Sequence, residues 1–377
     1  MCGTGQLFAG ILALIAAACV VPIYAVAASP ATPAPADGGD LATFGAEWFV
    51  TDFTRVKGFG PLFNNKSCVA CHAFPSVGGM GPEGVAIAIR VGRLTSSGYD
   101  PMIGRGGPVA RAHSLRETGD ECASAAVGIP LGANVSSVRN APPLFGLGLI
   151  DAIADADIIA AQRASGANGR LQKLTLPDGR ERIGRFGWKG DTATLKQFVA
   201  DAFRNELGMT NSLAPQELAP APSPRKRGCA NAATGVELSD SVLDAVTAYV
   251  AALPPPVEHP PTGPGGALFH ETGCESCHRP SFSAQGRDVW LYSDLLVHDL
   301  GPALNDEIVQ GAATGKDWRT TPLWGLGARP RFLHDGRARS VLDAVLAHGG
   351  EAAPAVQRFR ALPAEQQSAL LVFLAGL

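Results

Sequence analysis

The stretch SCVACH at residues 67–72 holds two cysteines spaced by two residues, with a histidine directly after the second, and CESCH at 274–278 repeats this arrangement. A zinc site would use four cysteines, or two with two histidines, without requiring a histidine next to each pair. A redox dithiol of the thioredoxin type would sit in a strand–helix–strand context, which is absent here. Covalent c-type haem uses all three residues, because two thiols bond the porphyrin vinyl groups and the imidazole reaches the iron.

We therefore predict two covalently bound c-type haems. The predicted haem-binding residues are Cys68, Cys71, His72, Cys274, Cys277 and His278. In each motif the histidine is the expected proximal ligand of the haem iron.

The N-terminus indicates export. Residues 1–27 carry no charged side chain and end in Ala25-Val26-Ala27, which is typical of a signal-peptidase site. We expect a signal peptide at 1–27, a Pro/Ala-rich tether at 28–44 and a periplasmic location, with a membrane-anchored form as the alternative because the basic N-terminal region is missing. The net charge of −3 gives no indication of nucleic-acid binding.

Export also bears on the remaining cysteines. Once Cys2 and Cys19 are removed with the signal, Cys122 and Cys229 are the only two outside the haem motifs. In an oxidising compartment such a pair favours a disulfide.

The two motifs belong to a longer internal repeat. The matched segments, in the same order in both copies, are LF at 62–63 and 268–269, PLFGLG at 143–148 and PLWGLG at 322–327, WKG at 188–190 and HDG at 334–336, and the apolar segments ending at Leu253 and Leu377. We therefore predict an N-terminal domain at 45–253 enlarged by insertions, a linker at 254–266 and a C-terminal domain at 267–377.

Local patterns predict a mainly α fold of two cytochrome c-like haem domains. Residues 239–253 carry a helical apolar stripe, and 363–377 repeat it. We expect each of these helices to pack across the helix that carries its CxxCH motif. A small β-hairpin is predicted in the first domain, with its turn at 177–179, and the 45 glycines and 29 prolines indicate long loops elsewhere.

Further segments extend the pattern, namely FGWKG at 186–190, YSDLLVHDLGPAL at 292–304 and FLHDGRARSVLDAVLAHGGEA at 332–352. Together with the CxxCH and PLFGLG motifs they resemble the di-haem oxidoreductases of the bacterial cytochrome c peroxidase and MauG superfamily, and the branch labelled thiol oxidoreductase in particular. The resemblance covers about residues 45–377. Paired cysteines in that branch also support a bridge between Cys122 and Cys229.

The resemblance implies different ligands for the two irons. His348, fourteen residues after His334, is at the position of the distal ligand of the electron-transfer haem. His298 is the reserve ligand, and His334 is expected to contact a propionate or the backbone. In the internal repeat His348 corresponds to Ala202, which cannot bind iron, so we expect the first haem to be open.

For that open haem the resemblance implies a peroxide pocket. Gln197 and Glu206 are near the positions of its amide and carboxylate, and Trp188 is at the position of a tryptophan between the haems. The carboxylate would move a proton and the amide would orient peroxide. The spacing from Leu195 to Gln197 is one residue shorter than in those enzymes. Alternative ligands of the first iron are Met80, Met102, His113 and Met209.

Two smaller sites follow from the resemblance alone. Asn140, Thr320 and Pro322 loosely match a calcium site between the domains. Arg139 and Arg319 are candidates to hold haem propionates by charge-assisted hydrogen bonds.

The sequence thus predicts a periplasmic di-haem c-type cytochrome that acts as a peroxidase-like oxidoreductase. The C-terminal haem would relay electrons from a small donor protein, a cytochrome c or a cupredoxin, to the N-terminal haem, where hydrogen peroxide or another small oxidant binds. Two alternatives are a non-enzymatic electron-transfer cytochrome and a MauG-like oxidase of a partner protein.

Overall fold

The computed structural model describes residues 40–56, 59–81, 87–119, 127–164, 169–176, 178–218, 236–256 and 258–377. Of these residues 36% are helical and 19% lie in strands or bridges. The expectation of a mainly α fold is therefore wrong, because helices and several small sheets build the molecule together. The predicted signal peptide and the two cysteines at 122 and 229 lie outside the described residues.

Ten α-helices are described. They are α1 Leu41–Val50, α2 Cys68–Cys71, α3 Leu147–Asp151, α4 Asp155–Ala164, α5 Leu195–Glu206, α6 Asp240–Ala252, α7 Gly263–Glu271, α8 Val341–Ala347, α9 Ala353–Ala361 and α10 Ala364–Ala375. Short 3₁₀ turns cover Phe53–Arg55, Leu115–Thr118, Cys274–Ser276, Pro302–Leu304, Leu326–Ala328 and Gly350–Ala352. Helices α1 and α7 begin inside the segments expected to be tether and linker. None of the described helices is both long enough and apolar enough to cross a bilayer.

The described strands form small antiparallel sheets. They are β1 Leu62–Phe63, β2 Ile87–Thr95, β3 Gly98–Asp100, β4 His113–Ser114, β5 Val135–Asn140, β6 Lys173–Thr175, β7 Glu181–Ile183, β8 Phe282–Ala284, β9 Arg287–Val289, β10 Val297–Asp299 and β11 Asp317–Arg319. The largest has the order β3-β2-β5, and the other pairs are β1-β4, β6-β7, β8-β9 and β10-β11.

Strand β2 and its partners lie where the sequence was expected to form loops. Its pairing with β5 runs from Ile87 opposite Asn140 to Gly92 opposite Val135. The alternation of Ile87, Ile89 and Val91 carries the period of two that a strand requires. The hairpin predicted around 177–179 is confirmed, because β6 pairs with β7 in antiparallel fashion.

The first unit, which corresponds to the predicted N-terminal domain at 45–253, is built on the crossing of α1 and α6. The Ser239 side chain caps α6 by accepting a hydrogen bond from the Val242 amide, and the predicted apolar stripe of this helix is buried. At the crossing, a Cβ on Gly45 of α1 would overlap the backbone carbonyl of Ala245 in α6. The absence of a side chain at Gly45 therefore allows the two helices to approach this closely.

The second unit, which corresponds to the predicted C-terminal domain at 267–377, repeats this arrangement with α7 and α10. In both units the partner helix precedes the CxxCH motif and does not carry it, so that detail of the expectation is wrong. The first motif forms the single-turn helix α2, and Cys274–Ser276 form a 3₁₀ turn after α7 ends at Glu271.

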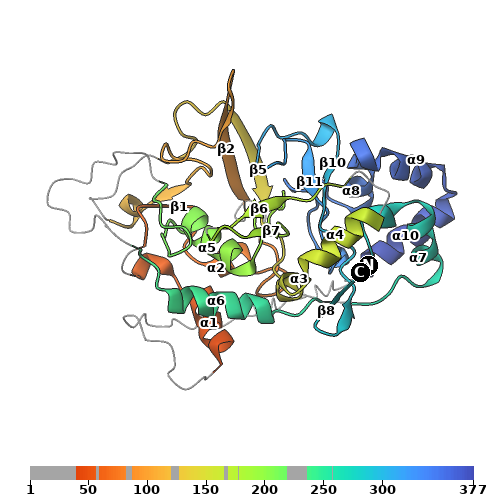
Figure 1. Cartoon of the computed structure of the whole chain (residues 1–377), viewed down its shortest axis with the longest axis horizontal. Helices are drawn as coiled ribbons and strands as arrows, with labels where there is room; N and C mark the ends of the chain where they lie inside the picture. The colour runs from red at the N-terminus through yellow and green to blue at the C-terminus, as the bar shows by residue number, and fades with distance from the viewer. Residues whose placement is uncertain are drawn as a thin grey trace, which may run out of the picture.

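The two units share apolar packing. One core cluster lies within the second unit, around Phe269, Phe359 and Leu370. The larger cluster contains Phe49, Phe203 and Leu243 of the first unit but also residues of 282–296 and Trp324 from the second. Figure 1 shows α1, α5 and α6 on one side of the molecule and α7, α9 and α10 on the other, with β10 and β11 between the large sheet and the C-terminal helices.

We expect Gly45→Ala to lower the free energy of unfolding by about 1–3 kcal/mol, because overpacking at the α1–α6 crossing forces backbone shifts. This loss would occur although alanine is by itself the better helix former. Urea unfolding followed by circular dichroism measures the change. Glu47→Ala on the exposed face of the same helix is the control and should stay within about 0.5 kcal/mol of wild type. A Gly45→Ala protein as stable as wild type would contradict the assigned crossing.

Candidate functional site

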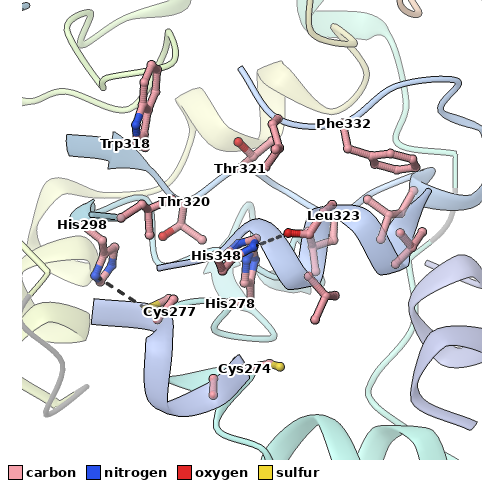
Figure 2. Close-up of a pocket in the computed structure, with 18 of the residues that line it drawn as sticks. Cys274, Cys277, His278, His298, Trp318, Thr320, Thr321, Leu323, Phe332 and His348 are labelled. Carbon is pink, nitrogen blue, oxygen red and sulfur yellow. Dashed lines mark hydrogen bonds between the residues drawn. The ribbon is translucent and has the colours of Figure 1, made fainter. Parts of the chain in front are cut away.

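A cavity of about 430 Å³ surrounds the second CxxCH motif. Its volume lies within the range of about 300–1,000 Å³ that is usual for cofactor pockets. Figure 2 shows Cys274, Cys277, His278 and His348 arranged around this pocket, with Trp318 and Phe332 at its far walls. The structure thus brings together the residues that were predicted to bind the second haem.

His278 and His348 face each other in the cavity with their ring centroids 6.4 Å apart. The Nδ1 of His278 donates to the Tyr292 carbonyl at 2.9 Å, and the Nδ1 of His348 donates to the Ala344 carbonyl at 2.7 Å. These hydrogen bonds fix both tautomers and leave each Nε2 as the free ligand atom. Burial lowers the pKa of His278 to about 4 and also lowers that of His348, so both rings are neutral as metal binding requires.

This spacing fits one haem iron between the two rings. With a metal–nitrogen bond of about 2 Å and the ring centroid roughly 1 Å farther, two axial imidazoles have centroids roughly 6 Å apart. Residues next to each histidine in the sequence position the rings of His278 and His348. Gly273, with a φ of +80°, begins the turn of the CxxCH motif, and Ser340 caps α8, which ends at His348.

Two half-buried arginines, Arg319 and Arg329, line the same cavity. Burial lowers the pKa of Arg319 and of Arg329 to about 10. Among the described residues neither forms an ion pair, and both guanidinium groups donate to backbone carbonyls, for instance Arg319 to Gly187 at 2.9 Å. Half-buried cations that form no ion pair within the described residues fit the propionates of a haem. Arg329 was not predicted, since nothing in its local sequence marks it.

Arg139 does not have the role that was expected of it. It is buried and pairs with the buried carboxylate of Asp306, while its guanidinium lies 4.9 Å above the ring of Trp318. The guanidinium therefore already has an anionic partner, which argues against a propionate beside it. Asp306 is far away in the sequence, so no local pattern could have shown the pairing.

His298 lies beside the second haem motif in a network of charged groups. Its Nε2 is 2.9 Å from Asp294 Oδ2, and its Nδ1 is 2.8 Å from Glu351 Oε2 and 3.6 Å from Cys277 Sγ. Burial alone would lower the pKa of His298, but its hydrogen bond to the Asp294 carboxylate and its contact with Cys277 outweigh burial and raise the pKa to about 11. An imidazolium held between two carboxylates has no lone pair for iron, which argues against His298 as the reserve ligand.

Neither carboxylate was predicted from the sequence. Asp294 stands four residues before His298 in the YSDLLVHD segment and could have been recognised there. Glu351 is 53 residues away from His298 and only the fold brings it close.

The first CxxCH motif has its own tethered histidine. Ser67 caps α2, and the Nδ1 of His72 donates to the Gly79 carbonyl at 3.0 Å. Burial lowers the pKa of His72 to about 4, which keeps the ring neutral. Glu206 lies near Cys71, and its Oε2 accepts a hydrogen bond of 2.7 Å from the Asn64 amide.

The structure does not bring Gln197 and Glu206 to one face. Both lie on α5, nine residues apart, which is about two and a half turns. Their side chains therefore leave opposite sides of the helix, and the Gln197 amide oxygen instead accepts from the Thr194 hydroxyl at 3.2 Å. Ala202, the counterpart of His348, is exposed on the same helix.

The other predicted residues are scattered. Trp188 lines the second cavity and donates from Nε1 to the Asn140 carbonyl at 3.0 Å. His334 is buried and stacks on Trp318, with 3.7 Å between ring centroids. Among the alternative ligands of the first iron, Met209 and Met102 are buried in the protein, Met80 lines the second cavity and His113 is paired with Glu117.

Of the residues predicted to bind calcium, Asn140 has a free side-chain oxygen, whereas the Thr320 carbonyl is already hydrogen-bonded. Both polar side-chain atoms of Asn140 are buried without a hydrogen-bond partner, which leaves its oxygen available to a ligand. The Thr320 carbonyl is used by Ser293 Oγ at 2.6 Å and by Arg319. In the described parts of the chain, no group of three or more His, Cys, Asp or Glu side chains could hold a metal ion.

The network around His298 predicts that the stability of the folded protein depends on pH. In the folded protein the pKa of His298 is raised from its usual value of 6.5 to about 11. The charged ring therefore contributes its full stabilisation below about pH 6.5. This stabilisation is lost as the pH rises toward about 11, because the unfolded chain releases the proton first. We expect the free energy of unfolding to fall from about pH 6 to about pH 9, and to fall less in His298→Gln. Urea titrations at both pH values test this. The exposed-residue variant His270→Gln should keep the wild-type decrease; equal decreases in all three proteins would refute the role of His298.

A family model described as "Di-haem oxidoreductase, putative peroxidase" matches residues 132–377. The match contains the second CxxCH motif, His348 and Trp188, and the first motif precedes it. Among solved structures, the chain is similar to Kuenenia stuttgartiensis hydrazine synthase pressurised with 20 bar xenon, with a TM-score of 0.44 and 14% identity over 100% of both chains. A comparison with curated proteins finds no match. With two CxxCH motifs and a family match over more than half of its length, the chain belongs to the di-haem oxidoreductases.

Proposed function

We propose that this di-haem oxidoreductase is a c-type, peroxidase-like enzyme in which the second haem carries electrons and the first reacts with peroxide. The observation that carries the proposal is the difference between the two units. Where the second offers His348 opposite His278, the first has the exposed Ala202. The family description supports the peroxidase class.

Haem iron supplies one-electron redox chemistry when bound, and it can bind a small oxidant where one axial position is free. In the second unit, Cys274 and Cys277 would hold the porphyrin covalently, while His278 and His348 would both bind its iron. A site closed in this way would exclude peroxide and suit electron transfer. Arg319 and Arg329 would neutralise the propionates.

In the first unit, Cys68, Cys71 and His72 would hold the haem from one side. Glu206 is the carboxylate that remains as a candidate to take and return a proton, and Asn64 fixes its Oε2. Gln197 is not proposed for peroxide orientation, because it leaves the opposite side of α5 from Glu206.

The wider setting is also a proposal. Trp188, in the wall of the second cavity, would lie on the electron path between the haems. The protein would act in the periplasm with a small donor protein, a cytochrome c or a cupredoxin.

Calcium binding at Asn140 is supported by the unpartnered side-chain oxygen of this residue. It is opposed by the hydrogen bonds that Ser293 and Arg319 donate to the Thr320 carbonyl.

Replacing His348 with alanine should convert one low-spin ferric haem into a high-spin one, because the second iron loses its sixth ligand. Electronic absorption and electron paramagnetic resonance spectra of the purified protein measure this. His270→Ala, at a histidine whose side chain is 76% exposed, should leave both spectra unchanged. An unchanged spectrum in His348→Ala would show that another residue binds this iron.

The two motifs should bind haem independently. We expect Cys68→Ser with Cys71→Ser to halve the covalent haem content and to remove the high-spin signal that responds to cyanide or peroxide, and Cys274→Ser with Cys277→Ser to halve the haem but keep that signal. Pyridine haemochrome assays and ligand titrations provide the readout. Two low-spin haems inert to both ligands, also after half-reduction, would instead establish a pure electron-transfer cytochrome.

A further inference from the structure

The ammonium group of Lys189 is fully buried in a cage of oxygen atoms. Its Nζ lies 2.7 Å from the Thr314 carbonyl, 3.1 Å from the Gly315 carbonyl and 3.0 Å from the Asp317 carbonyl. A fourth oxygen, Asp306 Oδ1, is 3.2 Å away. The exposed fraction of the Lys189 side chain is 0%.

The cage offers more ligands than an ammonium needs. Lys189 has three protons to donate, but four oxygens surround it and the Trp318 ring lies 3.9 Å from Nζ. Backbone carbonyls with one carboxylate are the oxygen ligands that a hard cation prefers. The segment 306–317 is thus shaped around a positive charge.

The cage and the cation come from different units. Lys189 follows Trp188 in the first unit, whereas all four oxygens belong to the second. The neighbouring backbone is held as well, because the Arg319 amide donates to the Trp188 carbonyl at 2.9 Å and Gln172 Nε2 donates to the Lys189 carbonyl at 3.1 Å. The ammonium therefore joins the two units immediately beside the wall of the second cavity.

We propose that segment 306–317 is a cation site whose resident ion is the Lys189 ammonium, which the other unit supplies on its own side chain and which thereby locks the two units together. Burial lowers the pKa of Lys189 to about 8, with Asp306 acting against this decrease, so the group is mostly charged at neutral pH. The cation site itself does not depend on the proposed peroxidase function.

Truncation to alanine should empty the cage and open it to a small free cation. We expect the Tm of holo Lys189→Ala in tetramethylammonium chloride to be lower than that of wild type by about 5 °C or more. Ammonium or potassium chloride at the same ionic strength should raise this Tm progressively with concentration, because a ligand that binds only the folded state stabilises it. Tetramethylammonium is too large to enter and controls for screening.

Two control variants separate the cation from mere packing. Lys189→Met fills the space without charge, so it should be destabilised but show the same Tm in all three salts. Lys316→Ala removes an exposed lysine of the same segment that pairs with Asp299, and it should also show no difference between the salts. Lys189→Ala responding equally to ammonium, potassium and tetramethylammonium would overturn the proposal.

Poor folding of the alanine variant would still give an answer. Refolding from urea in ammonium chloride and in tetramethylammonium chloride compares the yield of folded protein in each. Recovery only with the small cation supports the site, and equal failure in both rejects it. Because these readouts are thermal and conformational, they stay separate from any failure of the spectroscopic tests of peroxidase function.

Discussion

The hydrogen bond from the proximal imidazole to a backbone carbonyl is the interaction on which both haem sites depend. His72 donates to Gly79 at 3.0 Å and His278 to Tyr292 at 2.9 Å, so the same constraint operates in both units. Each bond sets the tautomer and aims Nε2 away from the backbone, while burial keeps the ring neutral. The crossing helix pairs α1–α6 and α7–α10 give these short motifs a rigid support.

Within this shared frame the units differ through the length of one helix. Helix α8 spans seven residues and ends at His348, whose ring turns back to the Ala344 carbonyl at the helix terminus. Helix α5 spans twelve residues and continues past Ala202, which therefore lies in mid-helix on an exposed face. His348 thus lies at a helix terminus, whereas its counterpart Ala202 lies on the solvent side of a continuous helix. The asymmetry between the two sites thus has a backbone origin as well as a side-chain one.

Features with a short-range origin could be predicted from the sequence. The CxxCH motifs, the helical stripe of 239–253 and the hairpin around 177–179 each depend on neighbouring residues. The β2–β5 pairing was not predicted, because the many Gly and Pro residues of the chain indicate loops and the alternation of residues 87–91 is short. Contacts such as His298 with Glu351 or Arg139 with Asp306 could not be inferred, because they join segments more than fifty residues apart. Gln197 and Glu206 do not share a face for a geometric reason, since nine residues on one α-helix place two side chains on opposite sides.

The shared apolar cluster has a consequence for the history of the fold. Residues of 282–296 and Trp324 from the second unit are buried among side chains of the first, so a chain divided at the linker would expose apolar surface on both fragments. An internal duplication ordinarily leaves two parts that can separate again. In this chain part of the second copy is buried in the interior of the first, so the two parts pack as one unit.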